Sequence, residues 1–508
     1  MIKLPTSRCR PSLVMFALLL LAGCKVGPDF KKPTAPESAS YSKKPIRDPH
    51  APNDVHGGGA QHFVSGKDIK FDWWKEFESP PLNSLVSKSL ASNPSIDAAK
   101  AALRQAQELT RAQVGFFYPQ VSGGYNLSRQ QVAGNVANTS APGQQYKGRN
   151  IVPLQSPTAP YNSSITYSMQ TSALTVGFTP DVFGLNRRTV ESLDAQAQIQ
   201  RFDLEAAYTT LASSVVAAAI GEASLRGQIK ATEEQIAYNK KMVDILKREV
   251  GNGYASRMDL AAQESQLAAV EATLPPMLKQ LAQQRDLISV LAGRIPGHEP
   301  QEIFEMESLH LARELPLSLP SKIIEQRPDV RAAEENMRSM NAQVGVAIAN
   351  RLPQFTINGG LSGTAQTFLA MFEPGGPGWS FVSSVTAPIF TGGTLYHRQK
   401  AAEEGLKQSI AQYQGTVLTA FQNVADTLHA LEQDGEGLRT AVEAERAAKV
   451  TLDLTQHQYQ AGYANFIALL SAEQAWQQAV LNRVQAQANR FGDTGALFMA
   501  LGGGWWNR

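Results

Sequence analysis

The amino-acid sequence contains an internal duplication, and this feature constrains its fold more than any other. Residues 93–99 align with residues 327–333, and the dipeptide Pro119-Gln120 recurs at the same spacing as Pro353-Gln354. Each half is therefore expected to carry the same elements in the same order. These are a helix, two strands, a long helix, a tight turn and a further helix.

Each half contains a long segment without proline, at residues 186–250 and 393–460. At ~1.5 Å per residue, a helix of this length reaches ~100 Å, which is far longer than a compact domain. Apolar residues in the second segment recur every seven positions, as Ile410, Val417, Val424 and Leu431. This heptad pattern predicts helices that pack side by side as coiled coils.

The shorter helices add up to the same length as the long ones. Those expected at 95–117 and 256–293 together match one long helix, and so do those expected at 328–351 and 463–500. Two short helices stacked end to end would then stand beside each long one. Each half is thus expected to supply two helical columns.

Two pairs of strands are expected, at 119–132 with 165–180 and at 354–366 with 379–390. Apolar residues alternate with Ser, Thr, Gly and Gln over parts of these segments. Alternation over about ten residues is the weak signature of a transmembrane β-strand. A sheet exposed to water fits the same segments nearly as well, so the sequence allows both interpretations.

The expected fold class is mainly α with a small β part. Four strands and four helical columns in one chain are too few to close a sheet without open edges. Three chains would close a twelve-stranded barrel on a twelve-column helical tunnel. A homotrimer is therefore expected.

The N-terminus has the pattern of a targeting segment. Basic residues precede an apolar run at 13–22, which is too short for a membrane span of roughly 20 residues, so residues 1–23 are expected to be a signal peptide. The run ends in Leu-Ala-Gly before Cys24, which favours a lipoprotein whose lipid is attached to Cys24. The alternative is an ordinary signal peptide with an incidental cysteine.

Composition and motifs exclude several classes of protein. With 47 basic and 45 acidic residues, no nucleic-acid partner is implied. The two cysteines lie at the extreme N-terminus, so no disulfide framework or zinc cluster is expected. The metalloprotease, P-loop, nucleophile-elbow and dinucleotide motifs are missing from the sequence. No stretch after the signal peptide resembles a transmembrane helix, so a membrane crossing would have to use strands.

A series of short motifs runs through the whole mature chain. The series begins with Leu21–Cys24 and residues 26–29, and continues through residues 71–77, 118–120, 181–184, 251–259, 327–330, 388–390, 459–470 and 501–506. In this order the motifs resemble the TolC-like outer-membrane efflux proteins, in the lipid-anchored NodT-type branch. Each motif is weak alone, and the series is specific.

The resemblance implies a homotrimer whose strands form one barrel in outer-membrane lipid and whose helices form a periplasmic tunnel ending in an iris. It also implies a periplasmic adaptor (membrane fusion) protein and an inner-membrane pump, usually of the resistance-nodulation-division class. The residue after the anchor is Lys25. Aspartate at that place typically retains bacterial lipoproteins at the inner membrane, so outer-membrane sorting is favoured.

The expected domain boundaries follow the duplication. Residues 1–23 are the signal peptide, and residues 24–80 are the lipid anchor and an extended tether rich in Pro, Lys, Ser, Gly and His. Residues 81–300 form the first repeat. Residues 301–508 form the second repeat with a C-terminal tail.

The tight turns between long and short helices are the main candidate sites. Glycine allows the positive φ that such a turn often needs. The resemblance assigns adaptor contact to two tips, Gly253, Tyr254, Ala255 and Ser256, and Gly462, Tyr463, Ala464 and Asn465. The alternative is that these are turn residues only.

The resemblance also places a gate beside the tips. Ile467 corresponds to an aliphatic ring, while Ser471 departs from the usual aspartate and puts an acidic selectivity ring in doubt. Asp259 matches an acid that holds the tip closed in some relatives. Three copies of Asp259 could repel one another or bind Arg257 or a cation. A helix-start carboxylate favoured by the helix dipole is an equal alternative.

The favoured hypothesis is that the protein is a passive exit duct for small molecules in a tripartite efflux pump. A non-conducting structural or adhesive trimer would explain the heptads and the anchor, but not the paired strands. An envelope hydrolase is disfavoured because no catalytic constellation is found. No catalytic residue, metal or cofactor is expected, apart from the covalent lipid on Cys24, and the cargo stays open.

Overall fold

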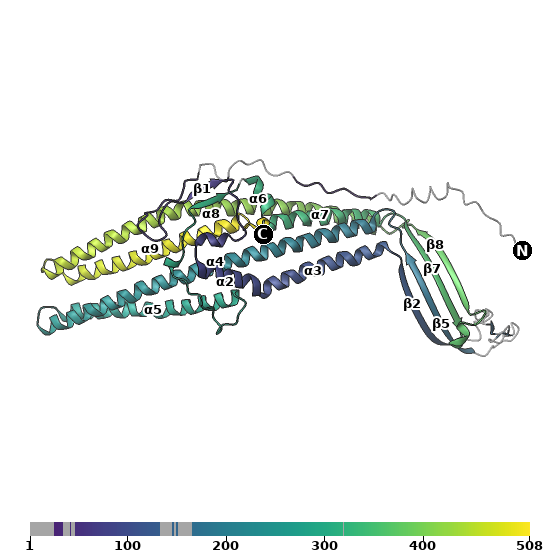
Figure 1. Cartoon of the computed structure of the whole chain (residues 1–508), viewed down its shortest axis with the longest axis horizontal. Helices are drawn as coiled ribbons and strands as arrows, with labels where there is room; N and C mark the ends of the chain where they lie inside the picture. Colours follow the sequence, from purple (N-terminus) through teal and green to yellow (C-terminus); the bar gives the residue numbers. More distant parts are fainter. Residues whose placement is uncertain are drawn as a thin grey trace. The chain divides into compact units, whose positions relative to one another are not determined.

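The computed structural model describes residues 25–33, 41, 46–132, 145–146, 149–150, 165–318 and 320–508. The elements of the first half follow the predicted order: α2 (Pro80–Ser92), α3 (Pro94–Val114), β2 (Gln120–Val132), β5 (Ile165–Phe178), α4 (Leu185–Gly251) and α5 (Arg257–Leu291). The second half repeats this order: α6 (Pro320–Gln326), α7 (Pro328–Ala349), β7 (Gln354–Ala365), β8 (Pro377–Thr386), α8 (Thr394–Gln460) and α9 (Phe466–Ala500). The prediction of a mainly helical duplicated chain is confirmed (Figure 1).

The two halves agree closely in helix length. The helices α4 and α8 have 67 residues each, and α5 and α9 have 35 each. The helices α3 and α7 have 21 and 22 residues. This agreement bears out the expectation that the halves supply equal helical columns.

Three details of secondary structure differ from expectation. The last strand was expected at 379–390, but β8 ends at Thr386, because Pro388 has no N–H to donate to a ladder. The helix α2 lies at the start of the first repeat and was not foreseen. Neither was the parallel pair of β1 (His62–Ser65) with β6 (Glu314–Leu317), which joins the tether to the start of the second repeat. A two-residue pair, β3 (Gln145–Tyr146) with β4 (Arg149–Asn150), lies between β2 and β5, in a segment most of which is outside the described residues.

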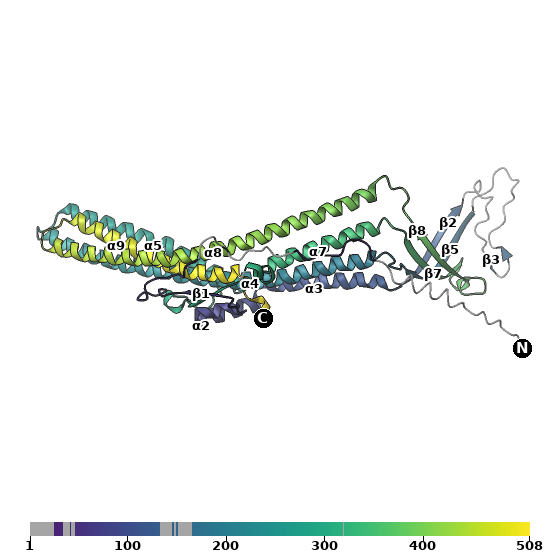
Figure 2. The same ribbon diagram turned by 90° about the horizontal axis from the view of Figure 1, so that it is seen from above.

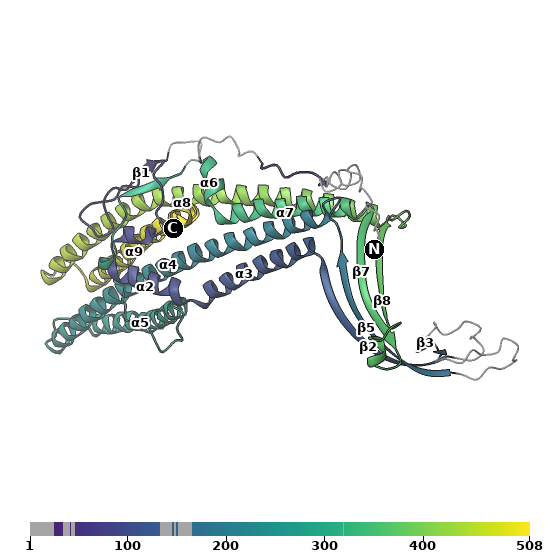
Figure 3. The same cartoon turned by 45° about the vertical axis from the view of Figure 1, so that its right-hand side comes forward.

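The chain forms two compact units, and each is described by itself. Unit 1 comprises residues 1–31, 106–197 and 337–409, and unit 2 comprises residues 32–105, 198–336 and 410–508. Unit 1 contains a four-stranded antiparallel sheet of order β2-β5-β7-β8, which Figure 3 shows from the side. The two repeats meet in this sheet, because β5 of the first pairs with β7 of the second.

The register of this sheet sorts its side chains by polarity. Residues opposite one another in an antiparallel pair point to the same face. One face carries Val121, Tyr125, Leu127, Leu174, Val176, Phe178, Phe355, Ile357, Leu361, Trp379, Phe381 and Val385. The other face carries mainly Ser, Thr, Asn, Gln and Gly, with Tyr167, Met169, Ala173 and Val382 as exceptions.

Hydrogen bonds confirm this assignment of faces. On the polar face, the hydroxyl of Ser122 lies 2.7 Å from that of Thr175, and the hydroxyl of Thr356 lies 2.7 Å from that of Ser384. On the apolar face, Trp379 is 80% exposed. An exposed apolar face of this kind suits contact with lipid better than contact with water. The register therefore favours transmembrane strands over a water-exposed sheet, the two alternatives that the sequence allows.

Unit 2 holds the ends of the long helices that lead to the turns, with α5 and α9 alongside them (Figure 2). The predicted heptad seam of α8 is buried at Val417, Val424 and Leu431. Ile410, at the edge of the unit, is instead 39% exposed. Near the C-terminus, Trp73 of η1 (Trp73–Phe77) stacks on Phe498 of α9, with ring centroids 5.1 Å apart.

One helix differs from the expectation about membrane-spanning segments. The helix α4 contains an 18-residue window with a mean hydropathy of 1.3, so by length and composition it could cross a membrane. Of that window, 44% is buried inside the protein. The helix buries Val215, Ala219 and Ala223 within unit 2. A buried core helix meets the same criterion, so this one helix is weak evidence of a membrane span.

Candidate functional site

Two helical turns of the same construction end the α4–α5 and α8–α9 hairpins. Gly253 and Gly462 each have a φ of +80°, a conformation that side chains with a Cβ rarely adopt. The N–H of Tyr254 donates to the carbonyl of Glu249 at 2.8 Å, and the N–H of Tyr463 donates to that of Gln458 at 2.8 Å. These six-to-one bonds close the long helices as Schellman-type caps. The predicted glycine turns are therefore observed in both repeats.

Each short helix then begins at a capping residue of its turn. Ser256 and Asp259 form a capping box at the start of α5, in which each side chain accepts from the other's backbone N–H. Asn465 accepts from the N–H of Ala468 at 2.9 Å at the start of α9. The turn tyrosines extend into solvent, with Tyr254 85% and Tyr463 86% exposed. The two tips thus offer similar rigid surfaces, each with an exposed aromatic ring.

The candidate gate residues do not all share one environment. Ile467 is 58% exposed, and Ser471 lies one turn further along α9 on the same exposed side. Asp259 is engaged in its capping box with Ser256. Within the described part of the chain, no ion pair joins Asp259 to Arg257. Inside one chain, Asp259 therefore has the geometry of the helix-start carboxylate.

A small four-helix core supports both tips. Its buried members come from α4, α8 and α9, and are Met242, Leu246, Leu452, Phe466, Leu469 and Ala472. Ala255 and Leu260 of the first turn and of α5 pack against it. The two hairpins are therefore held to each other directly beneath their turns.

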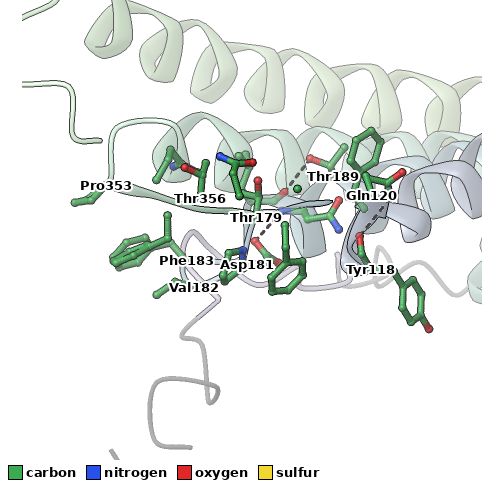
Figure 4. Close-up of a pocket in the computed structure, with 18 of the residues that line it drawn as sticks. Tyr118, Gln120, Thr179, Asp181, Val182, Phe183, Thr189, Pro353 and Thr356 are labelled. Atoms are coloured by element: carbon green, nitrogen blue, oxygen red, sulfur yellow. Dashed lines mark hydrogen bonds between the residues drawn. The ribbon is translucent and has the colours of Figure 1, made fainter. Parts of the chain in front are cut away.

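In unit 1, the junctions between strands and helices surround a cavity of about 500 Å³. Figure 4 shows it between the loop after β5, with Thr179, Asp181, Val182 and Phe183, and the start of β7, with Pro353 and Thr356. The carboxylate of Asp181 accepts from the N–H groups of Asn186 and Arg187, both at 2.9 Å, and so caps α4. Pro180 and Pro353, at the junctions between strand and helix, also line the cavity.

The segment that follows the predicted lipid anchor is bound to unit 1. Cys24 itself lies outside the described residues. The Lys25 ammonium pairs with the Glu191 carboxylate at 2.7 Å, and the Val26 N–H donates to the carbonyl of Phe183 at 3.3 Å. The buried Arg188 donates to the carbonyls of Val26 and Gly27, both at 2.9 Å.

Buried arginines hold loops in unit 2 as well. Arg285 of α5 donates to the carbonyls of Pro300 and Glu302, at 2.5 and 2.6 Å, and pairs with buried Glu222. Arg490 of α9 donates to the carbonyls of Gly57 and Gly59. Burial lowers the pKa of Arg490 to about 10, against the opposing effect of Asp434. The burial of these arginines could not be predicted from the sequence, because an arginine on a helix usually faces solvent.

No group of three or more His, Cys, Asp or Glu suitable for a metal ion occurs among the residues that the structure describes.

Comparison with known proteins places this geometry in a family. The family model described as outer membrane efflux protein matches residues 85–294 and 319–503. The solvent efflux pump outer membrane protein SrpC of Pseudomonas putida is 26% identical over 508 residues, covering 97% of this chain and 98% of the relative. The pyoverdine export outer membrane protein OpmQ of Pseudomonas putida is 25% identical over 435 residues, covering 85% of this chain and 88% of the relative.

Solved structures agree on the fold. The Campylobacter jejuni CmeC outer membrane channel has a TM-score of 0.80, with 20% identity and 95% of both chains covered. The open state of the Neisseria gonorrhoeae MtrE outer membrane channel has a TM-score of 0.76 with 22% identity, covering 95% of this chain and 99% of that one. Since the family model matches most of both repeats, this chain belongs to the outer membrane efflux protein family and is an outer-membrane exit duct for efflux.

Proposed function

We propose that three copies of this chain close into one passive duct that carries small molecules from an inner-membrane pump and the periplasm to the outside. The observation that carries this proposal is the two-faced sheet of unit 1. Its apolar face suits the hydrocarbon of the membrane, and its polar face suits a water-filled lumen. The duct itself needs no catalytic group, because the pump supplies the energy.

The edges of the sheet support the trimer. Among the described strands, β2 pairs only with β5 and β8 pairs only with β7 along their length, so each has an open edge. Unpaired N–H and C=O groups cost several kcal/mol each in hydrocarbon. Pairing β8 of one copy with β2 of the next satisfies both edges, and three four-stranded sheets complete a closed barrel.

The tips are the proposed contacts with a periplasmic adaptor protein. Tyr254 and Tyr463 are exposed on turns of the same construction, and aromatic residues of this kind are frequent anchors of protein interfaces. Ile467 would line the narrowest part of the tip, where three copies of its apolar side chain exclude water. The open position of Ser471 leaves this constriction without an acidic ring.

A lipid on Cys24 is the proposed second attachment to the membrane. Lys25 and Val26 are held at the strand–helix junction by Glu191, Phe183 and Arg188. A lipid on the preceding residue would therefore enter the membrane beside the base of the barrel. Its acyl chains would contribute about 0.8 kcal/mol per buried methylene.

Reconstitution in planar bilayers tests the duct. We expect heat-resistant trimers with low conductance in the unaltered protein, and a several-fold higher conductance in Ile467→Gly, which removes the apolar constriction. Ala468→Gly, on the neighbouring exposed position of α9, is the matched control and should not conduct more than the unaltered protein. Trimers that stay non-conducting in Ile467→Gly would overturn the proposal in favour of a structural envelope protein.

Accumulation in cells identifies the cargo. A deletion strain, with and without the gene restored, is compared across amphipathic dyes, antibiotics, aromatic acids, and copper or silver ions. We expect one class of compound to accumulate on deletion and to return to its original level on restoration. A restored strain that still accumulates that class would contradict a role in its export.

A further inference from the structure

A buried carboxyl group lies between the two hairpins of the tip. Glu473 of α9 is 1% exposed, and neither of its carboxyl oxygens has a hydrogen-bond partner among the described residues. Tyr238 of α4 faces it from the other hairpin. Its hydroxyl acts on the carboxyl group, although the two groups do not reach full hydrogen-bond geometry. The pair lies beside the four-helix core, against which Tyr238 packs.

Among the described residues, no lysine, arginine or histidine of the surrounding helices forms an ion pair with this carboxyl group. On α8, Lys449 is occupied by Asp453 at 2.7 Å, and the charge of Asp453 acts on Tyr238. On α5, the amide of the buried Gln263 donates to Asn239 of α4 at 2.7 Å. A buried carboxylate without a paired cation is strongly disfavoured relative to the neutral acid, and the Tyr238 hydroxyl offsets only part of this cost. The packed arrangement of the tip therefore favours Glu473 with its proton.

The duplication supplies an internal comparison. Glu264 of α5 is the equivalent of Glu473, since each lies eleven residues after its turn glycine, Gly253 or Gly462. The Glu264 side chain is 48% exposed and pairs with Lys247 at 3.3 Å. The same residue type at the same place in the repeat is thus solvated in one hairpin and enclosed in the other. Burial of Glu473 is a property of the contact between hairpins and not of the helix position.

We propose that Glu473 is a proton-binding site that keeps the two tip hairpins packed together while it is protonated and loosens their contact when it ionises. The mechanism is hydration: an ionised carboxylate gains several hydrogen bonds to water only if α9 moves away from α4. This inference rests on the proposed function, because it assigns a pH-dependent opening to the periplasmic end of the duct.

The direction of the effect follows from the environment. Burial raises the pKa of Glu473 from 4.5 to about 7, against the lowering effect of Tyr238. Below about pH 4.5, both the packed and the separated tips carry the proton, and the packed arrangement has its full stability. As the pH rises towards 7, the separated form ionises first and the advantage of packing is lost. Opening is therefore expected to increase with pH, mainly between 5 and 8.

Chemical labelling of the tip reports this change directly. Ala472→Cys places a thiol at a position that is 5% exposed, next to Glu473. Ala475→Cys places one on the exposed side of the same helix and corrects for the effect of pH on thiol chemistry. The full-length trimer in liposomes is labelled with a maleimide from pH 5 to pH 9. We expect the rate ratio of the two sites to rise by at least about tenfold, because each pKa unit between 4.5 and about 7 corresponds to a tenfold change in equilibrium.

Two variants isolate the carboxyl group. Glu473→Gln should hold the ratio at its low-pH value across the range, and Glu264→Gln should leave the rise intact. A ratio that does not change with pH when Glu473 is present would overturn the proposal. So would a rise that persists in Glu473→Gln.

Bilayer conductance at the same pH values separates this inference from the proposed function. If conductance rises with the labelling ratio, both hold. If labelling follows Glu473 while Ile467→Gly and the unaltered protein never conduct, the proton site stands and the duct assignment fails. If Ile467→Gly conducts and labelling ignores Glu473, the duct stands and the proton site is refuted.

Discussion

The guanidinium of Arg188 binds the backbone of Gly27, with Nη2 donating to its carbonyl oxygen at 2.9 Å. Arg188 is fully buried, and its Nη1 pairs with Glu191 at 2.9 Å. The contact depends on small neighbours, because a Cβ on Gly27 would lie 2.6 Å from the Cα of Gly345. One side chain thus secures the segment that follows the predicted anchor.

Loss of this contact should release the N-terminal segment. In Arg188→Met, two backbone carbonyls and Asp29 lose a charged donor and Glu191 keeps only Lys25. We expect a loss of about 3 kcal/mol in the free energy of unfolding of unit 1. Amide exchange at residues 26–29 should accelerate in the folded protein. Arg201→Met, on an exposed site of the same helix, should change stability by less than about 0.5 kcal/mol. Unchanged exchange at residues 26–29 would show that Arg188 does not hold the segment.

Alanine should destabilise the protein at a turn glycine, and it should stabilise the protein at a glycine inside a helix. Gly462→Ala forces alanine to a φ of +80° and should cost about 1 kcal/mol. Gly405→Ala, at an open position inside α8, should instead gain about 0.5–1 kcal/mol. Denaturant unfolding followed by circular dichroism measures both changes. Equal effects of the two substitutions would contradict the turn assignment.

The two faces of the sheet should respond oppositely to charge. Phe381→Arg introduces a cation on the apolar face and should reduce folding into lipid vesicles by about 2–4 kcal/mol. Ser380→Arg, one residue earlier on the polar face, should fold normally and shift the ion selectivity of the channel towards anions. Heat-modifiable mobility on gels and reversal potentials provide the measurements. A change in ion selectivity caused by Phe381→Arg would mean that this face, and not the face of Ser380, lines the lumen.

A second carboxyl group should make unit 2 sensitive to pH. Burial, with a contribution from Asp493, raises the pKa of Asp434 from 3.8 to about 7, against the effect of Arg490. A raised pKa in the folded state means that stability is greatest below about pH 4 and is lost as the pH rises towards 7. The melting temperature of unit 2 should therefore fall between pH 5 and pH 8.

Substitution of this carboxyl group tests the assignment. Asp434→Asn should remove part of that pH dependence, and Asp426→Asn, at an exposed site of the same helix, should not. Glu473→Gln measured in parallel accounts for Glu473, whose raised pKa lies in the same range. An undiminished slope in Asp434→Asn would assign the pH dependence to other residues.

Much of the architecture could be predicted from the sequence, because it depends on local rules. The long helices follow from proline-free segments with heptads, and the turns follow from the glycines at 253 and 462. Two of the mistakes share a different cause. The helix α2 and the pairing of β1 with β6 depend on partners distant in the sequence, which local propensity does not report. The end of β8 follows from a local rule, because Pro388 cannot donate to the ladder.

The duplicated order of elements, the lengths of the helices and the position of the tips follow from the sequence alone. The face that each strand residue occupies depends instead on the packed fold, because the register between β2, β5, β7 and β8 sets that face and a slip of one residue would reverse it. The packed fold also decides which charges are buried. In the sequence, Arg188 and Glu473 resemble ordinary residues of a helix surface, but both are buried. Glu264, the repeat equivalent of Glu473, does lie on the helix surface. Burial arises from contacts between segments far apart in the chain, so the enclosed arginine and the unpaired carboxyl group become visible only once the helices are packed.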